Sequence, residues 1–187
     1  MVNDVAFSPD GTQIVFAGAD NLIHFWSREN WQEVNTLSTD GAQAVAYSYD
    51  GKYIAVATLK GLISLWDAQT LQKVYEFPGH NGVIWDIGFS SDGQYLASGG
   101  SDGIVRLWDV ATGKEVRRFV GHTALVNNVV YSPKGDLVAS ISLDGTVKFW
   151  MTDIEALKSA MCHVLPRDLT PDERARYNIT NTGATCP

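Results

Sequence analysis

The sequence predicts an all-β fold, a β-propeller of four blades, followed by a short helical C-terminal tail. The first observation behind this prediction is a repeat: Trp26, Trp66, Trp108 and Trp150 stand 40, 42 and 42 residues apart, a period typical of repeat architectures. The second is that the same order of short apolar strands and tight turns surrounds each tryptophan. A single four-stranded sheet of this size cannot bury both of its faces, so sheets of this kind stack radially and cover one another.

Within each repeat, the first element is a short strand of alternating apolar residues that ends at a turn closed by glycine. The strands are VNDVAF, AQAVAY, VIWDIGF and LVNNVVY, and the turns after them are SPDG, SYDG, SSDG and SPKG. Glycine at the last turn position supplies the positive φ that such turns need. We therefore expect the chain to reverse direction directly after each of these strands.

The second and third elements form a hairpin that ends in the repeated tryptophan. The second strands are IVFAGA, YIAVAT, YLASGG and LVASIS, and the third are NLIHFW, GLISLWD, GIVRLWD and GTVKFW. A fourth, outer strand follows in three repeats, as QEVNTL, QKVYEF and KEVRRF. The fourth repeat lacks this segment, which leaves its tryptophan strand, residues 146–150, as an unpaired edge. We therefore expect the blades to be the C-terminal part of a longer ring that upstream blades complete, or a four-blade unit that completes itself by self-association with another chain.

Residues 152–187 form a tail in which the periodicity changes from strand to helix. In TDIEALKSAMCHVL, Thr152 and Glu155 form a capping box ahead of apolar residues at helical spacing. In TPDERARY, Thr170 is the expected cap and Glu173 the residue that closes the box. Two short helices are expected, in the place of the missing outer strand.

Composition excludes several classes of partner. The chain of 187 residues has a formal charge of −7 and no basic run longer than a pair of arginines, so it lacks the surface that attracts nucleic acid or an anionic membrane. No apolar run approaches the roughly 20 residues that span a bilayer. The first residues, MVNDVAFSPDG, lack the basic and apolar parts of a signal peptide. We expect a cytoplasmic protein without nucleic-acid or membrane partners.

The repeats resemble those of the WD-repeat propellers, over residues 1 to about 151. The motifs that carry this resemblance are GH at 79–80 and 121–122, SDG at 101–103, LDG at 143–145, and WD at 66–67 and 108–109. In that family a repeat often holds a structural, hydrogen-bonded set of His, Ser or Thr, Asp and Trp. The resemblance implies two complete sets here, His80, Ser98, Asp102 and Trp108 in the third repeat and His122, Ser140, Asp144 and Trp150 in the fourth.

The first two repeats depart from this pattern. The second repeat places other residues at the His, Ser and Asp positions, namely Ser38, Val56 and Lys60. The first keeps Asp20 and Trp26 but has Phe16 in place of the Ser. We therefore expect looser packing in the first two blades.

The His, Ser and Asp of each complete set are also the residue types of a nucleophilic triad, because a serine nucleophile needs a His base that a carboxylate orients. A structural role is favoured, since the set recurs and nothing in the sequence indicates an oxyanion hole or an exposed nucleophile. Cys162, His163 and Cys186 could supply metal ligands, but their spacing matches no common zinc pattern. We expect no catalytic residue, no cofactor and no metal.

In WD-repeat propellers, the positions that flank the first apolar residue of each inner strand, and the position before the turn Asp, open onto one rim. On this resemblance the candidate binding residues are Asn3, Ala19, Gln43, Leu59, Val83, Trp85, Ser101, Leu125, Asn127 and Leu143. Trp85 is the strongest candidate, because a partly exposed Trp beside aliphatic side chains is typical of a protein-recognition hot spot. The alternative is that Trp85 packs against a neighbouring blade or fills the channel.

The tail carries a second, narrower resemblance. LPRDLTPDERARY followed by a terminal TCP is similar to the ending of bacterial multidomain signalling proteins in which WD repeats follow a nucleotide-hydrolysing switch domain, a protease or a kinase. Arg174 stands where that ending commonly has Trp. The sequence therefore favours a non-catalytic protein–protein interaction scaffold, the sensor or recruitment region of a larger bacterial signalling protein, with a protein or peptide ligand at the rim. The alternatives are a hydrolase that uses a His, Ser and Asp set, and a purely structural propeller that needs further blades.

Overall fold

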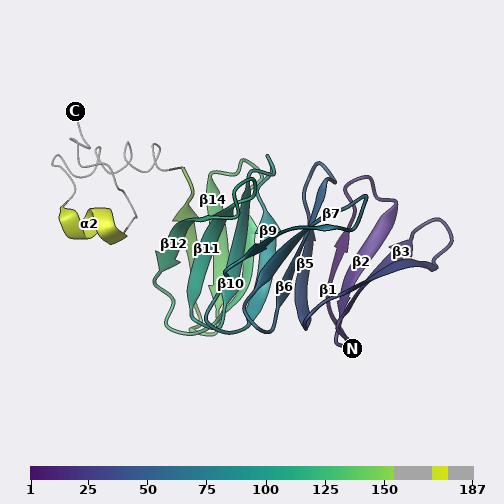
Figure 1. Ribbon diagram of the computed structural model, residues 1–187. Helices are drawn as coiled ribbons and strands as arrows, with labels where there is room; N and C mark the ends of the chain where they lie inside the picture. The colour runs from purple at the N-terminus through teal and green to yellow at the C-terminus, as the bar shows by residue number, and fades with distance from the viewer. Residues whose placement is uncertain (154–169, 177–187) are drawn as a thin grey trace.

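The computed structural model describes residues 1–153 and 170–176, and the first of these segments is a β-propeller. Fifteen strands form four antiparallel sheets, the blades, in which the strand order follows the chain (Figure 1). Blade 1 contains β1 (Val2–Phe7), β2 (Gln13–Gly18), β3 (Leu22–Ser27) and β4 (Glu33–Ser38). Blade 2 contains β5 (Ala42–Tyr47), β6 (Tyr53–Thr58), β7 (Ile63–Asp67) and β8 (Lys73–Phe77). Blade 3 contains β9 (Ile84–Phe89), β10 (Tyr95–Gly100), β11 (Ile104–Asp109) and β12 (Glu115–Val120). Blade 4 contains β13 (Val126–Tyr131), β14 (Leu137–Ser142) and β15 (Val147–Met151).

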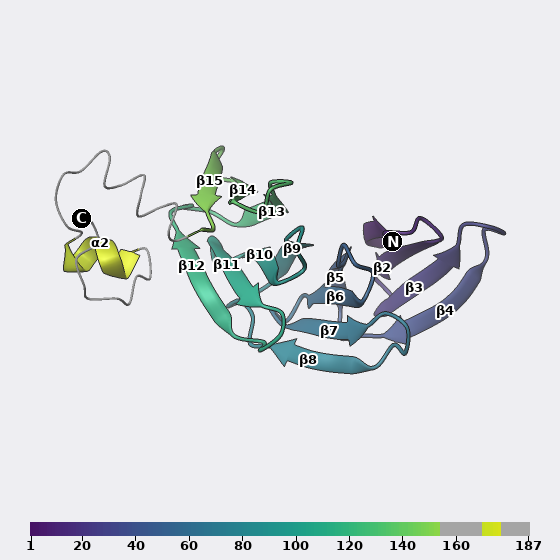
Figure 2. The same ribbon diagram turned by 90° about the horizontal axis from the view of Figure 1, so that it is seen from above.

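The blades stand side by side along an arc, with β1–β4 at one end and β13–β15 at the other (Figure 2). The first strand of each blade is the innermost, and these strands contact one another in the order β1, β5, β9 and β13. The predicted propeller of four stacked blades is thereby confirmed.

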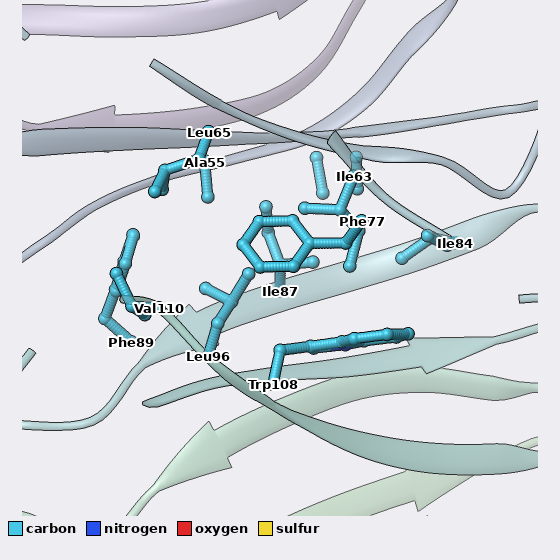
Figure 3. Close-up of a cluster of buried hydrophobic side chains, with 12 residues drawn as sticks. Ala55, Ile63, Leu65, Phe77, Ile84, Ile87, Phe89, Leu96, Trp108 and Val110 are labelled. Atoms are coloured by element: carbon cyan, nitrogen blue, oxygen red, sulfur yellow. The ribbon is translucent and has the colours of Figure 1, made fainter. Parts of the chain in front are cut away.

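Three clusters of buried apolar side chains fill the spaces between successive blades. Between blades 2 and 3, the ring of Phe77 from β8 lies 5.9 Å from the ring of Trp108 from β11, centroid to centroid. Leu65 and Ile84 belong to the same cluster (Figure 3). Full burial of one such side chain contributes about 1.5–3 kcal/mol. Contact between blades therefore buries apolar side chains that a single sheet would leave exposed.

Each inner strand ends at a turn that contains its own hydrogen bonds. In blade 1 the Ser8 hydroxyl donates to Asp10 Oδ1 at 2.6 Å and accepts the N–H of Gln13 at 2.9 Å. The second and third blades repeat both bonds. A glycine with positive φ closes this turn in all four blades, as the sequence predicts.

Every inner strand also carries a β-bulge near its first residue. In blade 3, Ile84 pairs with Gly100 and Asp86 pairs with Gly99, so Trp85 is the extra residue. The same shift in register occurs in the other blades, and the extra residues there are Asn3, Gln43 and Asn127. A bulge resets the alternation of side chains, so that Ile84 and Ile87, three residues apart, are both buried.

Blade 4 ends at β15, and no further strand of the described residues pairs with it. The helix α2 (Pro171–Arg176) begins with the predicted capping box: the N–H of Thr170 donates to Glu173 Oε2 at 2.8 Å, and the N–H of Glu173 donates to Thr170 Oγ1 at 3.3 Å. The Thr152 hydroxyl, expected to cap the other helix, donates to the carbonyl of Gly135 at 2.6 Å. The body of that expected helix, from residue 154, lies outside the described residues.

Candidate interaction surface

The polar set of the third blade joins four segments of the chain. His80 precedes β9, Ser98 lies in β10, Asp102 lies in the turn after β10, and Trp108 lies in β11. His80 Nε2 is 2.7 Å from Ser98 Oγ, and His80 Nδ1 is 2.8 Å from Asp102 Oδ1. The indole N–H of Trp108 donates to Ser98 Oγ at 2.8 Å. The set therefore links the segment before the inner strand β9 to the two middle strands of the blade, β10 and β11.

One assignment of hydrogens satisfies all of these bonds. An indole nitrogen only donates, so Ser98 Oγ accepts from Trp108 and donates its own hydrogen to His80 Nε2. His80 Nδ1 then carries the ring hydrogen and donates it to Asp102. Burial acts to raise the pKa of Asp102, but hydrogen bonds from His80 and Arg106 outweigh it and hold that pKa well below its ordinary value.

This geometry favours a structural role over a catalytic one. Ser98 and Trp108 have an exposed fraction of 0%, and the Ser98 hydroxyl is already bonded to both neighbours. A nucleophile needs access to its substrate and a site for the developing oxyanion. Ser140, the equivalent residue of blade 4, is also buried.

The set of the fourth blade repeats this arrangement. His122 Nε2 lies 2.8 Å from Ser140 Oγ, His122 Nδ1 lies 2.8 Å from Asp144 Oδ2, and the indole N–H of Trp150 donates to Ser140 Oγ at 2.8 Å. The Thr146 hydroxyl is the main cause that holds the pKa of Asp144 well below its ordinary value, with His122 adding to it. Trp150 is half-buried, unlike Trp108. The outer part of blade 4 is thus more open to solvent.

Blades 1 and 2 place different partners around their tryptophans. The indole N–H of Trp66 donates to Ser64 Oγ on its own strand at 2.9 Å. Trp26 Nε1 is buried, and none of the described residues accepts its hydrogen. Phe16 occupies the position of the missing Ser, and its ring lies 6.3 Å from the Trp26 ring. Looser packing of blades 1 and 2 stays a prediction, for which the Trp26 indole gives a physical reason.

A histidine in blade 1 takes the place of an arginine in blade 3. Arg106 in β11 donates to carboxylates on both sides, at 2.9 and 2.6 Å. His24, at the same position in β3, lies with Nε2 3.0 Å from Asp20 Oδ2, and its Nδ1 contacts Glu33 Oε1. Burial acts to lower the pKa of His24, but the hydrogen bonds to Glu33 and Asp20 outweigh it and raise that pKa above its ordinary value.

The predicted rim residues lie at the end of the blades where the inner strands begin, and the bulges place four of them there. In each blade, the residue that directly follows the second strand donates its backbone N–H to the carbonyl of the residue that directly precedes the inner strand. Ser101 bonds to Val83 in this way at 2.8 Å, and Leu143 bonds to Leu125 at 3.1 Å. The structure therefore brings predicted rim residues together in pairs in blades 3 and 4, whereas in blades 1 and 2 Ala19 and Leu59 bond to Met1 and Gly41.

Trp85 is fixed in place but not covered. Its indole N–H donates to Ser101 Oγ at 3.0 Å, and the residue is half-buried. Asn3, the equivalent residue of blade 1, instead donates from Nδ2 to the carbonyl of Ala42 at 2.8 Å and so joins blade 1 to blade 2. Among the remaining rim residues, the exposed ones are Ala19, Leu59, Ser101, Asn127 and Leu143, and the half-buried ones are Gln43, Val83 and Leu125.

Sequence reasoning missed a groove of about 340 Å³ along the inner strands, to which all four blades contribute, among others through Phe7 and Tyr131. Asp86 lies in this groove, and burial raises its pKa to about 6. The backbone N–H of Val129 opposes this shift and the nearby charge of Asp4 adds to it. The one signal in the sequence was that Asp4 and Asp86 occupy the same position of the repeat.

Within residues 1–153 and 170–176, no group of three or more His, Cys, Asp and Glu side chains is placed to hold a metal ion. Cys162, His163 and Cys186 lie outside these described residues. In the same part of the chain, no helix is both long enough and apolar enough to cross a membrane.

Comparison with known proteins finds similarity to WD repeats. The family model described as WD domain, G-beta repeat, matches residues 71–109 and 113–151. The chain has the fold of a WD-repeat propeller. A crystal structure of RRP9 WD40 repeats is similar to this chain, with a TM-score of 0.73 and 28% sequence identity over 80% of the chain. The chain spans 47% of the length of that protein chain.

The comparisons add two further findings. The model described as Eukaryotic translation initiation factor eIF2A matches residues 1–60, the part in which the polar sets are incomplete. No curated protein matches the sequence. The WD repeats suggest a protein–protein interaction scaffold.

Proposed function

We propose that this WD-repeat propeller is a non-catalytic scaffold that binds a protein or peptide at the rim carrying Trp85. The observation that carries the proposal is the Trp85 side chain: a bulge turns it out of β9, and the bond to Ser101 fixes its ring while part of the residue stays exposed. Ordered tryptophans of this kind often dominate the binding energy of protein interfaces. Leu59 and Leu143, both exposed, add apolar surface to the same rim.

The chemistry of the rim suggests the kind of segment that it binds. Apolar side chains alternate there with Ser101, Asn127 and Gln43, which offer hydrogen bonds. The chain as a whole has a formal charge of −7. An acidic protein attracts basic segments and repels acidic ones, so we expect the partner to present an apolar residue flanked by neutral or basic residues.

The hydrolase alternative has less support. It requires Ser98 or Ser140 to reach a substrate, and both side chains are buried.

The proposal extends to the larger protein in which the scaffold works. The resemblance of LPRDLTPDERARY to the ending of bacterial multidomain proteins supports a sensor or recruitment region of a larger, cytoplasmic bacterial signalling protein. In this proposal, self-association or further blades upstream complete the ring.

The test begins with a displayed library of random peptides selected on the immobilised chain. Selected peptides are then titrated into wild-type protein, Trp85→Ala and Leu143→Ala. Because hot-spot tryptophans contribute about 2 kcal/mol or more, we expect Trp85→Ala to weaken binding by about 30-fold or more. We expect a smaller loss, about 3–10-fold, for Leu143→Ala.

Tyr75→Ala is the matched control, since Tyr75 is an exposed aromatic residue on the outer strand β8, away from the rim. It is expected to bind the peptides as wild type does. Peptides that bind Trp85→Ala and wild type equally well would contradict the proposal.

A further inference from the structure

The loop between β8 and β9 is fixed on both sides of its tip. The N–H of His80 donates to the carbonyl of Gly61 in blade 2 at 2.8 Å, and the carbonyl of Val83 accepts an N–H from the turn after β10 at 2.8 Å. The His80 ring is held within the polar set of blade 3. Asn81 and Gly82, between these two anchors, are both exposed. The loop is therefore firmly positioned while its tip is open to water.

The tip carries a side-chain amide and a backbone N–H that are both unbonded. Among the residues that the structure describes, none bonds to the Asn81 side chain or to the Gly82 N–H. The backbone N–H of Asn81 donates to Asp102 Oδ2, at 3.3 Å. Gly82 has a φ of +114°, a conformation that glycine adopts without a clash from a Cβ. The amide and the N–H that follows it are thus both accessible.

Other asparagines in the turns of the chain differ from this pair. The sequence contains a single Asn-Gly pair. After Asn21, the N–H of Leu22 donates to an Asp carboxylate at 3.2 Å. After Asn30, the N–H of Trp31 donates to the carbonyl of Ser27 at 3.0 Å. In both of these turns, the N–H that follows the asparagine is engaged and belongs to a residue with a bulky side chain.

We infer that Asn81 and Gly82 form a site of spontaneous deamidation, the reaction that makes asparagine thermolabile. The Gly82 nitrogen loses its proton and attacks Cγ of Asn81, so that a new C–N bond closes a cyclic imide. The bond from Cγ to the side-chain nitrogen breaks, and that nitrogen takes up the proton and leaves as ammonia. Water then adds to one of the two imide carbonyl groups and opens the ring, which gives aspartate or isoaspartate at position 81. The reaction consumes only water, and glycine favours it because no side chain obstructs the attacking nitrogen.

Either product places a negative charge in the loop that carries His80. Asp102, which accepts the Asn81 N–H, carries the same charge, so the two carboxylates repel each other. Isoaspartate also adds one carbon to the backbone between Asn81 and Gly82, while the bonds of His80 and Val83 hold the two sides of the tip in place. Both changes weaken the contact of His80 with Asp102 and lower the stability of blade 3. This inference does not depend on a ligand at the rim.

The test incubates the purified full chain in mildly alkaline buffer, below its melting temperature, and follows each asparagine by peptide mass spectrometry. The peptide that contains Asn81 is expected to show the mass change of an Asn to Asp conversion first, ahead of the peptides that contain Asn21 and Asn30. Protein isoaspartyl methyltransferase is expected to label isoaspartate in the same peptide. As conversion proceeds, the melting temperature should fall by about 2–4 °C, the shift that a small local loss gives in a chain of this size.

Asn81→Gln separates this site from general ageing of the sample, because the longer side chain closes a larger ring and does so much more slowly. The variant is expected to stay unlabelled and to keep its melting temperature during the incubation. Asn30→Gln, which changes another exposed asparagine in a turn, is the matched control and is expected to be labelled and destabilised as the wild type is. An unconverted Asn81 in the wild type, or a label that persists in Asn81→Gln, would overturn the site. Conversion of Asn81 without a change in melting temperature would overturn the effect on His80 and Asp102.

Discussion

Replacement of Ser98 by Ala removes the hydroxyl that joins the polar set of blade 3. The Trp108 indole N–H then has no acceptor in a site with no exposed surface, which costs about 1–3 kcal/mol. The lost hydrogen bond to His80 Nε2 adds about 1 kcal/mol. The free energy of unfolding is therefore expected to fall by about 2–4 kcal/mol.

Urea denaturation followed by circular dichroism measures this change. Ser140→Ala is the matched comparison: it removes the same hydroxyl from blade 4, where Trp150 is half-buried and water can replace part of the lost bonding. We expect a smaller loss there, about 1–2 kcal/mol. A loss below about 0.5 kcal/mol for Ser98→Ala, the range of an ordinary surface substitution, would refute the assignment of the set as a structural element.

Three further predictions concern stability. The pKa of His24 is raised above its ordinary value of 6.5, so the stabilisation from its contacts with Asp20 and Glu33 is complete below pH 6.5 and is lost as the pH rises through the raised pKa. Thermal melting between about pH 5 and 8 should show this loss in the wild type and not in His24→Gln. Gly79→Ala should destabilise the fold by about 3 kcal/mol, because its Cβ would lie 1.8 Å from the carbonyl oxygen of Gly61. A Cβ at Gly93 would have nothing within 4 Å, so Gly93→Ala should cost only about 1–2 kcal/mol, the cost of placing alanine in the left-handed backbone conformation. Urea denaturation of both variants compares these losses. The amides of β2 and β3 around Trp26 should exchange hydrogen faster than those of β10 and β11, as mass spectrometry can measure, and equal rates would contradict the expected looseness of blade 1.

The order of strands within each blade could be predicted from the sequence because each repeat contains the signals for it within a short stretch. The glycine turns, the alternating strands and the tryptophan at a fixed period are all short-range signals. These signals predicted the outer strands β4, β8 and β12. The capping box at Thr170 was predicted from an equally short-range signal, because its side chain bonds to a residue only three positions along the chain.

The parts that the sequence did not predict depend on pairs of distant residues. Alternation alone does not reveal the bulge at Trp85, because it requires the register of β9 against β10. The cluster of His24 with Glu33 forms only when β3 pairs with β4, and the inner groove around Asp86 needs all four blades in place. Such contacts arise from packing between elements and leave little trace in the residues on either side.

The central claim is that the rim binds while the buried polar sets support the blades, and one paired comparison tests it most directly. Peptides selected on the wild-type chain are titrated into Trp85→Ala and Ser98→Ala, and the melting temperature of each variant is measured in the same buffer. The account predicts that Trp85→Ala loses affinity but melts close to wild type, and that Ser98→Ala melts at a lower temperature but keeps its affinity while folded. Normal affinity in Trp85→Ala, or wild-type melting in Ser98→Ala, would contradict it.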